Sequence, residues 1–264
     1  AVGFLVLLAI NPAHAWADGF VRILKGGFHD APYGVGKELA NAAPLIMTGL
    51  SVGFAFKTGL FNIGAAGQYT LGAYGALYCA IMLKLPWFVC LLAAAILGGL
   101  WGAIPGFFKA YFNINEVITS IMFNWIGLYL VNELVYQNGT GPMYDVRNTR
   151  TLNLGKSAEY AQSVIPDFGL NKLFQTNSTT IAIFLAAAVA ILIWVVLNKT
   201  TFGYELKAVG LNKSAARYAG INEKKNIILS MAIAGALAGF GAGLFYLSNV
   251  GEWNPLNSTS LPAM

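Results

Sequence analysis

The sequence predicts an all-α protein, a polytopic bundle of transmembrane helices, from its composition and from the length of its apolar segments. Of its 264 residues, 57% are hydrophobic and only 10% are charged, whereas a soluble domain carries about 25% charged residues. Such a chain lacks the polar side chains to cover a core in water, so lipid is the solvent that suits it. Its long apolar segments do not alternate with period two, which argues against an outer-membrane barrel.

The apolar segments predict about six full spans, because a helix needs about 20 apolar residues to cross the hydrocarbon core. The apolar stretch at 1–11 predicts a partial span before them, and we expect the natural chain to extend beyond both ends. Pro44 and Pro105 lie within spans and are expected to bend or interrupt them. The whole chain, 1–264, is treated as a single transmembrane domain. The six predicted spans are 38–56, 65–83, 86–108, 116–136, 179–198 and 226–247.

The distribution of charge predicts which side each connection faces. There are 16 Lys and Arg residues against 11 Asp and Glu, and they form no basic stripe of the kind that binds nucleic acid. Short cytoplasmic loops are enriched in Lys and Arg, and the segment 199–225 has the densest positive charge, so we place it in the cytoplasm. The long segment 137–178 is then extracellular. It is either a docking surface for an external partner or a solvated connector.

The sequence contains no recognisable pattern of residues for catalysis, metal binding or nucleotide binding. Cys79 and Cys90 fall in apolar runs and are interpreted as buried small side chains. His14 and His29 have no Cys or carboxylate cluster at metal-ligand spacing. The sequence has no phosphate-binding Gly-x-x-x-x-Gly-Lys-Ser/Thr loop, catalytic triad or paired carboxylates. We therefore expect no metal, no cofactor bound by this chain and no enzymatic activity in it.

Polar residues and glycines interrupt the apolar pattern between the first two full spans, in the run Phe61-Asn62-Ile63-Gly64-Ala65-Ala66-Gly67-Gln68. Irregular backbone at membrane depth persists only where protein buries it or where it lines a wet cavity. Asn62 and Gln68 are therefore candidates for a substrate pathway, at the N-terminus of a helix. The alternative is a helix cap followed by a face of small residues that packs on another helix.

A second polar stretch surrounds the start of the span 116–136. Asn115 before Glu116 is typical of helix capping. Asn124 lies deep in the span and shares a face with Ser120 and Gly127, so we expect it to point into the bundle as a second pathway candidate. The adjacent Trp125 either offers a stacking plane to a base or faces lipid.

Glycines in the last span form a ridge suited to close helix packing, at Gly235, Gly239 and Gly243. In the predicted cytoplasmic segment, Asn212 can cap a short helix and Gly220 can end it. Such a helix presents small residues with charged neighbours, and it either fits a groove in a cytoplasmic partner or lies on lipid. Its small residues are Ala215, Ala216 and Ala219, and its flanking residues are Lys213, Arg217 and Tyr218.

Three motifs resemble one family of membrane proteins. The run Gly210-x-Asn212-x-x-Ala215-Ala216-x-Tyr218-Ala219-Gly220-Ile221 resembles the coupling loop of ABC importer permeases for branched-chain amino acids, simple sugars and nucleosides. The run at 61–68 is similar to a signature that these permeases share. The run Asn115-Glu116-Val117-Ile118-x-Ser120-Ile121-Met122-x-Asn124-Trp125 resembles the bacterial purine-nucleoside permeases.

The resemblance implies a permease subunit in a bacterial inner membrane. It implies three partners, namely a cytoplasmic ATPase that binds ATP and Mg²⁺, a second and different permease, and an extracellular substrate-binding lipoprotein. A sugar or a branched-chain amino acid is the alternative cargo. An ion-coupled transporter or channel is disfavoured because Glu116 and Glu133 lie only at span ends. The implied coupling residues are Gly210, Asn212, Ala215, Ala216, Arg217, Tyr218 and Gly220.

Overall fold

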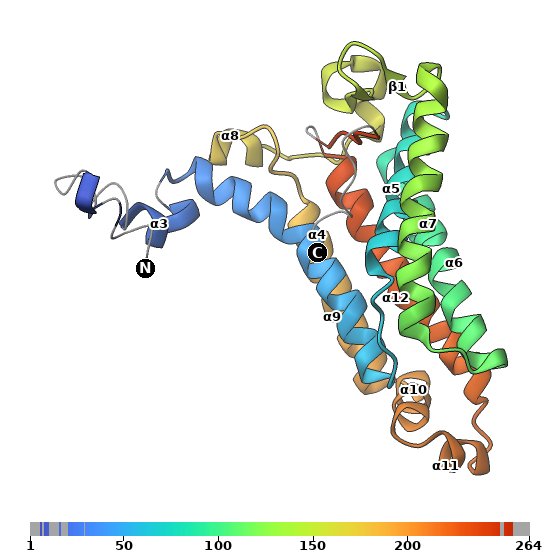
Figure 1. Ribbon diagram of the computed structural model, residues 1–264. Helices are drawn as coiled ribbons and strands as arrows, with labels where there is room; N and C mark the ends of the chain where they lie inside the picture. The colour runs from blue at the N-terminus through green and yellow to red at the C-terminus, as the bar shows by residue number, and fades with distance from the viewer. Residues whose placement is uncertain are drawn as a thin grey trace.

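The structure is a computed structural model that describes residues 6, 8–10, 16, 21–28, 30–248 and 251–255. The predicted partial span at 1–11 falls largely outside these residues, and His14 and His29 fall wholly outside them. The described chain is an elongated bundle of helices with small elements at both ends (Figure 1). The prediction of an all-α polytopic bundle is confirmed.

A long helix occupies each of the predicted full spans. Five of the described helices are long and apolar enough to cross a membrane. The predicted span 65–83 is occupied by α5, which has 17 residues. At 1.5 Å per residue this helix is about 25 Å long, a little shorter than the hydrocarbon core. The long helices are α4 (Tyr33–Lys57), α5 (Ala65–Ile81), α6 (Trp87–Phe112), α7 (Glu116–Tyr136), α9 (Ala182–Lys199) and α12 (Glu223–Tyr246).

Short elements lie at the two opposite ends of the bundle (Figure 1). One end carries α10 (Thr201–Leu211) and α11 (Lys213–Tyr218). The other end carries an antiparallel pair of strands, in which Tyr144 pairs with Thr151 and Asp145 with Arg150. The strands are β1 (Tyr144–Asp145) and β2 (Arg150–Thr151). Before α4, α3 (Val21–Lys25) lies to one side of the bundle (Figure 1) and is followed by η2 (Gly26–Phe28). Between α7 and α9, the other short elements are η3 (Gln137–Gly139), η4 (Leu154–Lys156), η5 (Ala158–Ser163) and α8 (Leu170–Phe174).

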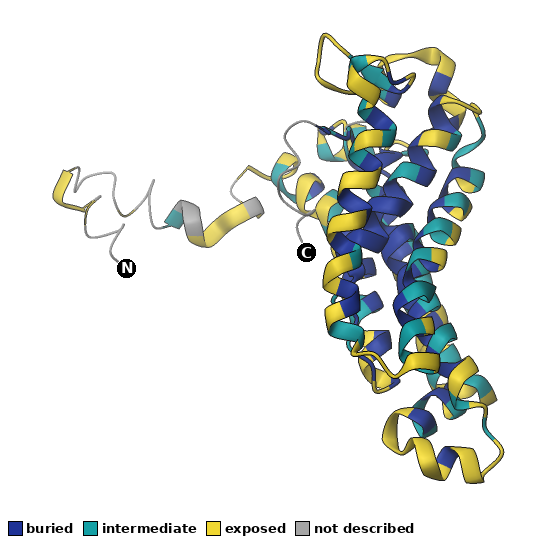
Figure 2. Cartoon of the chain, turned by 45° about the vertical axis from the view of Figure 1, so that its right-hand side comes forward, coloured by how far each residue is buried: buried dark blue, intermediate teal, exposed yellow. Residues whose placement is uncertain are grey.

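Helix α12 is the centre of the bundle and packs on α4, α5 and α6. In its most apolar stretch 67% of the residues are buried, against 17% in that of α9. Figure 2 shows buried residues along the middle of the bundle and exposed ones on its outer faces and ends. Glycines bring the backbones of α12 and α6 into contact, because a Cβ on Gly235 would lie 2.3 Å from the carbonyl oxygen of Gly98. A Cβ on Gly239 would lie 2.3 Å from the carbonyl oxygen of Ala94, and one on Gly243 would meet Leu91 at 2.7 Å.

The two prolines do not break their helices. Helix α4 runs through Pro44 and α6 runs through Pro105 without interruption. Helix α4 is bent along its length and lies beside α9 (Figure 1). Asn115 caps α7 by accepting a hydrogen bond from the backbone N–H of Val117 at 2.9 Å.

We predict that Gly239→Ala lowers the free energy of unfolding by about 1–3 kcal/mol, because the added methyl group overpacks the contact with α6. The matched control is Gly49→Ala in α4, where a Cβ would meet no atom within 4 Å. That change should leave stability unchanged or raise it by about 0.5–1 kcal/mol, because Ala favours a helix interior over Gly. Denaturant unfolding of both variants in detergent micelles measures the difference, and equal stabilities would contradict the role of this contact.

Candidate functional site

The chain between α4 and α5 enters the bundle without helical structure. Leu60, Asn62 and Gly64 of this segment are all buried. Part of its backbone bonds locally, since the N–H groups of Gly59 and Leu60 donate to carbonyl oxygens at the end of α4, at 3.1 and 3.0 Å. The remaining polar groups depend on side chains, since lipid supplies no hydrogen bonds.

Asn62 and Gln68 form a reciprocal pair of amides inside the bundle. The Nδ2 of Asn62 donates to Oε1 of Gln68 at 2.8 Å, and Nε2 of Gln68 donates to Oδ1 of Asn62 at 3.0 Å. Asn62 also donates to the Ser51 hydroxyl of α4 at 3.1 Å. Both amides are buried, so the pair ties the irregular segment to α4 and to the first turn of α5.

Asn124 joins the middle of α7 to the start of α5. Its Oδ1 accepts a hydrogen bond from the backbone N–H of Gly67 at 2.8 Å, and its Nδ2 donates to the carbonyl oxygen of Ile63 at 2.9 Å. The first turn of a helix has N–H groups without intrahelical partners, and Asn124 satisfies one of them from a neighbouring helix.

Small residues allow these amides to meet. A Cβ on Gly64 would lie 3.0 Å from Nε2 of Gln68 and 3.2 Å from the Ser120 hydroxyl, and a Cβ on Gly102 of α6 would also lie 3.2 Å from that nitrogen. Four helices therefore converge on the cluster of Asn62, Gln68 and Asn124, called here the amide cluster. Within the described chain, the buried Ser120 hydroxyl has no hydrogen-bond partner.

The amide cluster holds backbone in place with its own polar atoms. Each amide is engaged by another amide, a hydroxyl or a backbone group, so the cluster positions the start of α5 between α4, α6 and α7. Trp125 lies apart from it on the outer face of α7. That side chain is 41% exposed and stacks on Tyr129 with ring centres 6.1 Å apart.

Further buried polar contacts lie between the amide cluster and the end of the bundle that carries α10. The hydroxyls of Thr58 and Ser230 bond to each other, and Asn226 of α12 donates to Glu205 of α10 at 3.2 Å. The sequence interpretation missed Ser51 and these four residues. The sequence does show that each of these polar residues lies inside or beside an apolar span. This position suggests a buried hydrogen-bond partner but does not identify which residue the partner is.

Helix α10 touches the irregular segment through its backbone. A Cβ on Gly210 would lie 2.6 Å from the carbonyl carbon of Thr58 and 2.8 Å from the nitrogen of Gly59. Gly59 has a φ of +73°, which glycine adopts without strain. Because no side chain separates them, the two backbones at this point lie in direct contact.

Helix α11 forms a short exposed turn beyond α10. Asn212 caps it by accepting from the N–H of Ala215 at 3.0 Å, and Gly220 follows it with a φ of +82°. Ala215, Arg217 and Ala219 are exposed, and Tyr218 is 94% exposed. Ala216 is only 4% exposed. The face that α11 offers outward therefore differs from the three-alanine face that the sequence suggested, because Ala216 turns into its own chain.

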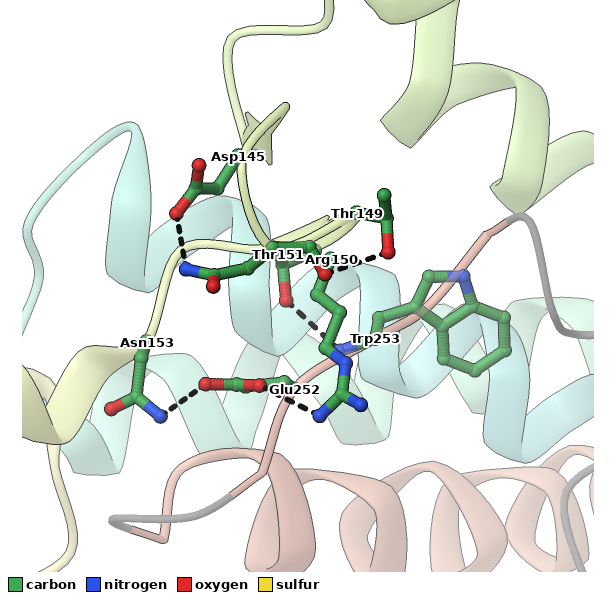
Figure 3. Close-up of polar contacts among 8 residues, drawn as sticks. Asp145, Thr149, Arg150, Thr151, Asn153, Glu252 and Trp253 are labelled. Atoms are coloured by element: carbon green, nitrogen blue, oxygen red, sulfur yellow. Dashed lines mark hydrogen bonds and ion pairs between the residues drawn. The ribbon is translucent and has the colours of Figure 1, made fainter.

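The long segment 137–178 is folded, and the chain after α12 holds it (Figure 3). Thr151 exchanges two bonds with the backbone of Trp253, at 2.8 and 2.9 Å. Glu252 accepts from Arg150 at 3.2 Å and also from Asn153. In the turn between the strands, the N–H of Arg147 and the amide of Asn148 hold the pKa of Asp145 below its ordinary value. This segment is therefore an ordered surface rather than a loose connector.

The family model and the relatives described below are all permease components of transport systems. The family model described as branched-chain amino acid transport system, permease component, matches residues 36–262. The chain is 35% identical to the guanosine ABC transporter permease protein NupP of Bacillus subtilis, over 92% of this chain and 68% of that protein. It is 32% identical to the nucleoside ABC transporter permease protein NupB of Lactococcus lactis, over 94% of this chain and 68% of that protein.

A third relative is the glucose ABC transporter permease protein TsgB13 of Haloferax volcanii, 33% identical over 91% of this chain and 63% of that protein. No solved structure matches. The family match covers most of the chain, and the apolar helices make it a multi-pass membrane protein. The chain therefore belongs to the family of permease components of branched-chain amino acid transport systems.

Proposed function

We propose that this chain is a permease subunit of an ATP-driven importer that carries nucleosides across a bacterial inner membrane. It works with a cytoplasmic ATPase that binds ATP and Mg²⁺, with a second permease, and with an extracellular binding lipoprotein. The observation that carries the proposal is the similarity to guanosine and nucleoside permeases over more than nine-tenths of the chain. The second candidate cargo is a sugar, which the similarity to a glucose permease favours.

The arrangement of the two ends supports this function. The segment 199–225 is dense in Lys and Arg and lies at one end of the bundle, so the positive-inside rule puts that end in the cytoplasm. The folded segment 137–178 is then extracellular, where a binding lipoprotein can dock. The sequence contains no phosphate-binding loop, so in this proposal ATP is hydrolysed on a partner chain.

We predict that uptake of labelled guanosine into proteoliposomes requires ATP and the ATPase subunit. Proteoliposomes that contain the complete complex should concentrate guanosine against its gradient, and unlabelled adenosine should compete while glucose and leucine should not. Concentration by this chain in the absence of the ATPase would refute the proposal. Competition by glucose with none by adenosine would replace nucleosides with the sugar alternative.

The amide cluster is proposed to lie beside the translocation pathway, with Asn62, Gln68 and Asn124 as its residues. Its position supports this, because four helices meet there around a non-helical segment and one unpaired hydroxyl, Ser120. Trp125 faces outward on α7, so we propose contact with lipid or with the second permease for it, in preference to base stacking.

We predict that pathway and packing roles separate in a pair of variants. Asn62→Leu leaves the buried amide of Gln68 unpaired and should cost about 1–3 kcal/mol of stability. Asn62→Leu combined with Gln68→Met replaces both amides by apolar groups, leaves only the Ser51 hydroxyl without its Asn62 partner, and should restore part of that stability. Transport per assembled complex should fall in both variants. Transport that recovers together with stability in the double variant would reduce the pair to a packing role.

Helix α11 is proposed to dock into the ATPase through its exposed residues. Gly210, Asn212 and Gly220 shape the turn, while Ala215, Arg217 and Tyr218 present outward. Ala216 supports the turn from inside the chain.

We predict that Ala215→Trp weakens association with the ATPase by roughly tenfold or more, because overpacking such a contact costs about 1–3 kcal/mol. Ala215 is the better test position than Ala216, where a Trp would disturb α11 itself. Ala158→Trp, exposed at the opposite end, is the matched control and should bind normally. Pull-down of the ATPase measures the effect. Unchanged binding of the ATPase by the Ala215→Trp variant would instead favour the alternative that α11 lies on the lipid surface, where a Trp side chain is energetically favourable.

A further inference from the structure

A cavity of about 420 Å³ opens between α4 and α9 where these helices reach α10. Its walls are largely apolar and include Leu50 and Phe54 of α4 and Ile193 and Leu197 of α9. Its volume lies within the range of about 300–1,000 Å³ that is common for small-molecule sites. The cavity is distinct from the amide cluster, which shares none of its lining residues.

The cavity faces the outside of the bundle. Helix α9, which forms one wall, is the least buried of the apolar helices described, and Trp194 at the cavity is 55% exposed. On the opposite wall, a Cβ added to Gly53 would meet no atom within 4 Å. The groove is therefore open above Gly53 and accessible from the hydrocarbon that surrounds a membrane protein.

Lysines gather at the end of the cavity nearest α10. Lys57, the last residue of α4, and Lys207 of α10 both line it. The ammonium of Lys207 donates to Oδ1 of Asn198 at 2.9 Å, which is a neutral partner. Lys199 does not line the cavity, but its ammonium lies 5.9 Å from the ring centre of Trp194, which does.

These positive charges are not compensated within the described part of the chain. Its ion pairs include none of the three lysines. The acidic residue of α10, Glu205, accepts a hydrogen bond from Asn226 of α12 instead. The cavity thus combines an apolar groove with a cationic end, which suits a ligand with an apolar body and an anionic head.

We propose that this cavity binds an anionic phospholipid of the surrounding membrane. An acyl chain occupies the groove between α4 and α9 above Gly53, and the phosphate lies between Lys57 and Lys207. Lysine binds phosphate as a point charge, and basic pockets between transmembrane helices are suited to anionic headgroups. A lipid held there contacts α4, α9 and α10 together, and so it braces the joint between the spans and the α10 end.

The test uses the full chain in its complex, reconstituted in nanodiscs that contain dioleoylphosphatidylglycerol and dioleoylphosphatidylcholine. Native mass spectrometry of the released complex should find phosphatidylglycerol retained in preference to phosphatidylcholine. Lys57→Gln and Lys207→Gln should each weaken that preference about fivefold, and the double variant about 30-fold. Added inorganic phosphate should not compete, because the acyl chain contributes to binding.

Two controls separate the site from general attraction to basic residues. Lys225→Gln removes an exposed positive charge at the same end of the bundle, outside the cavity, and should keep the preference. Gly53→Leu places a side chain in the groove, where its Cβ meets no atom within 4 Å, and should abolish retention, whereas Gly49→Leu, one turn earlier and outside the cavity, should not. Equal retention of both lipids by the wild type, or equal losses in Lys57→Gln and Lys225→Gln, would overturn the proposal.

Discussion

The fold depends on the need to satisfy buried backbone that is not helical. The segment between α4 and α5 passes through the interior of the bundle, where an unpaired N–H or C=O group would cost several kcal/mol. Asn124 satisfies the groups of Ile63 and Gly67 from α7, and the pair of Asn62 and Gln68 ties the segment to α4. Because hydrogen bonds require a defined distance and direction, they fix how far α4, α5 and α7 are shifted along their axes relative to one another.

Close backbone packing makes those bonds possible. Gly102 of α6 lies against Gln68 on one side and against Gly235 of α12 on another, and any side chain at this position would push one of them away. Gly72 of α5 meets Gly239 of α12 in the same manner. Helix association in lipid relies on such van der Waals contact, since apolar burial gives little advantage there. The glycine contacts and the amide cluster are therefore two parts of one packing arrangement.

The spans were predictable because only length and apolar content decide them, and both are local properties of the sequence. The inward direction of Asn124 was predictable too, since Ser120 and Gly127 share its face and all three are buried. The hydrogen-bond partners of the polar residues were not predictable. Glu252 and Trp253 hold Arg150 and Thr151 across about a hundred residues, and no local pattern connects such distant positions.

The inward orientation of Ala216 was also not predictable, although it depends on residues that are close in the sequence. A helix as short as α11 has too few residues for periodicity to define its buried side. Its orientation is instead set by how the chain enters and leaves it. The entry follows Gly210, which rests on the backbone of Thr58 and Gly59, and the exit returns at once, with the N–H of Ile221 bonding to the carbonyl of Ala216 at 3.0 Å.

The contact at Gly210 also connects α10 physically to the chain that leads into the amide cluster. Gly59 lies three residues before Asn62, and the hydroxyl of Thr58 bonds to Ser230 of α12. A displacement of α10 must therefore act on the backbone that leads into the amide cluster, because no flexible side chain lies between them to absorb it. The Gly210 contact and the three residues that follow Gly59 make one short connection between α10 and the amide cluster, beside the packing of α10 on α9 and α12. An exposed end segment and a buried polar cluster that share so short a path are well placed to move together.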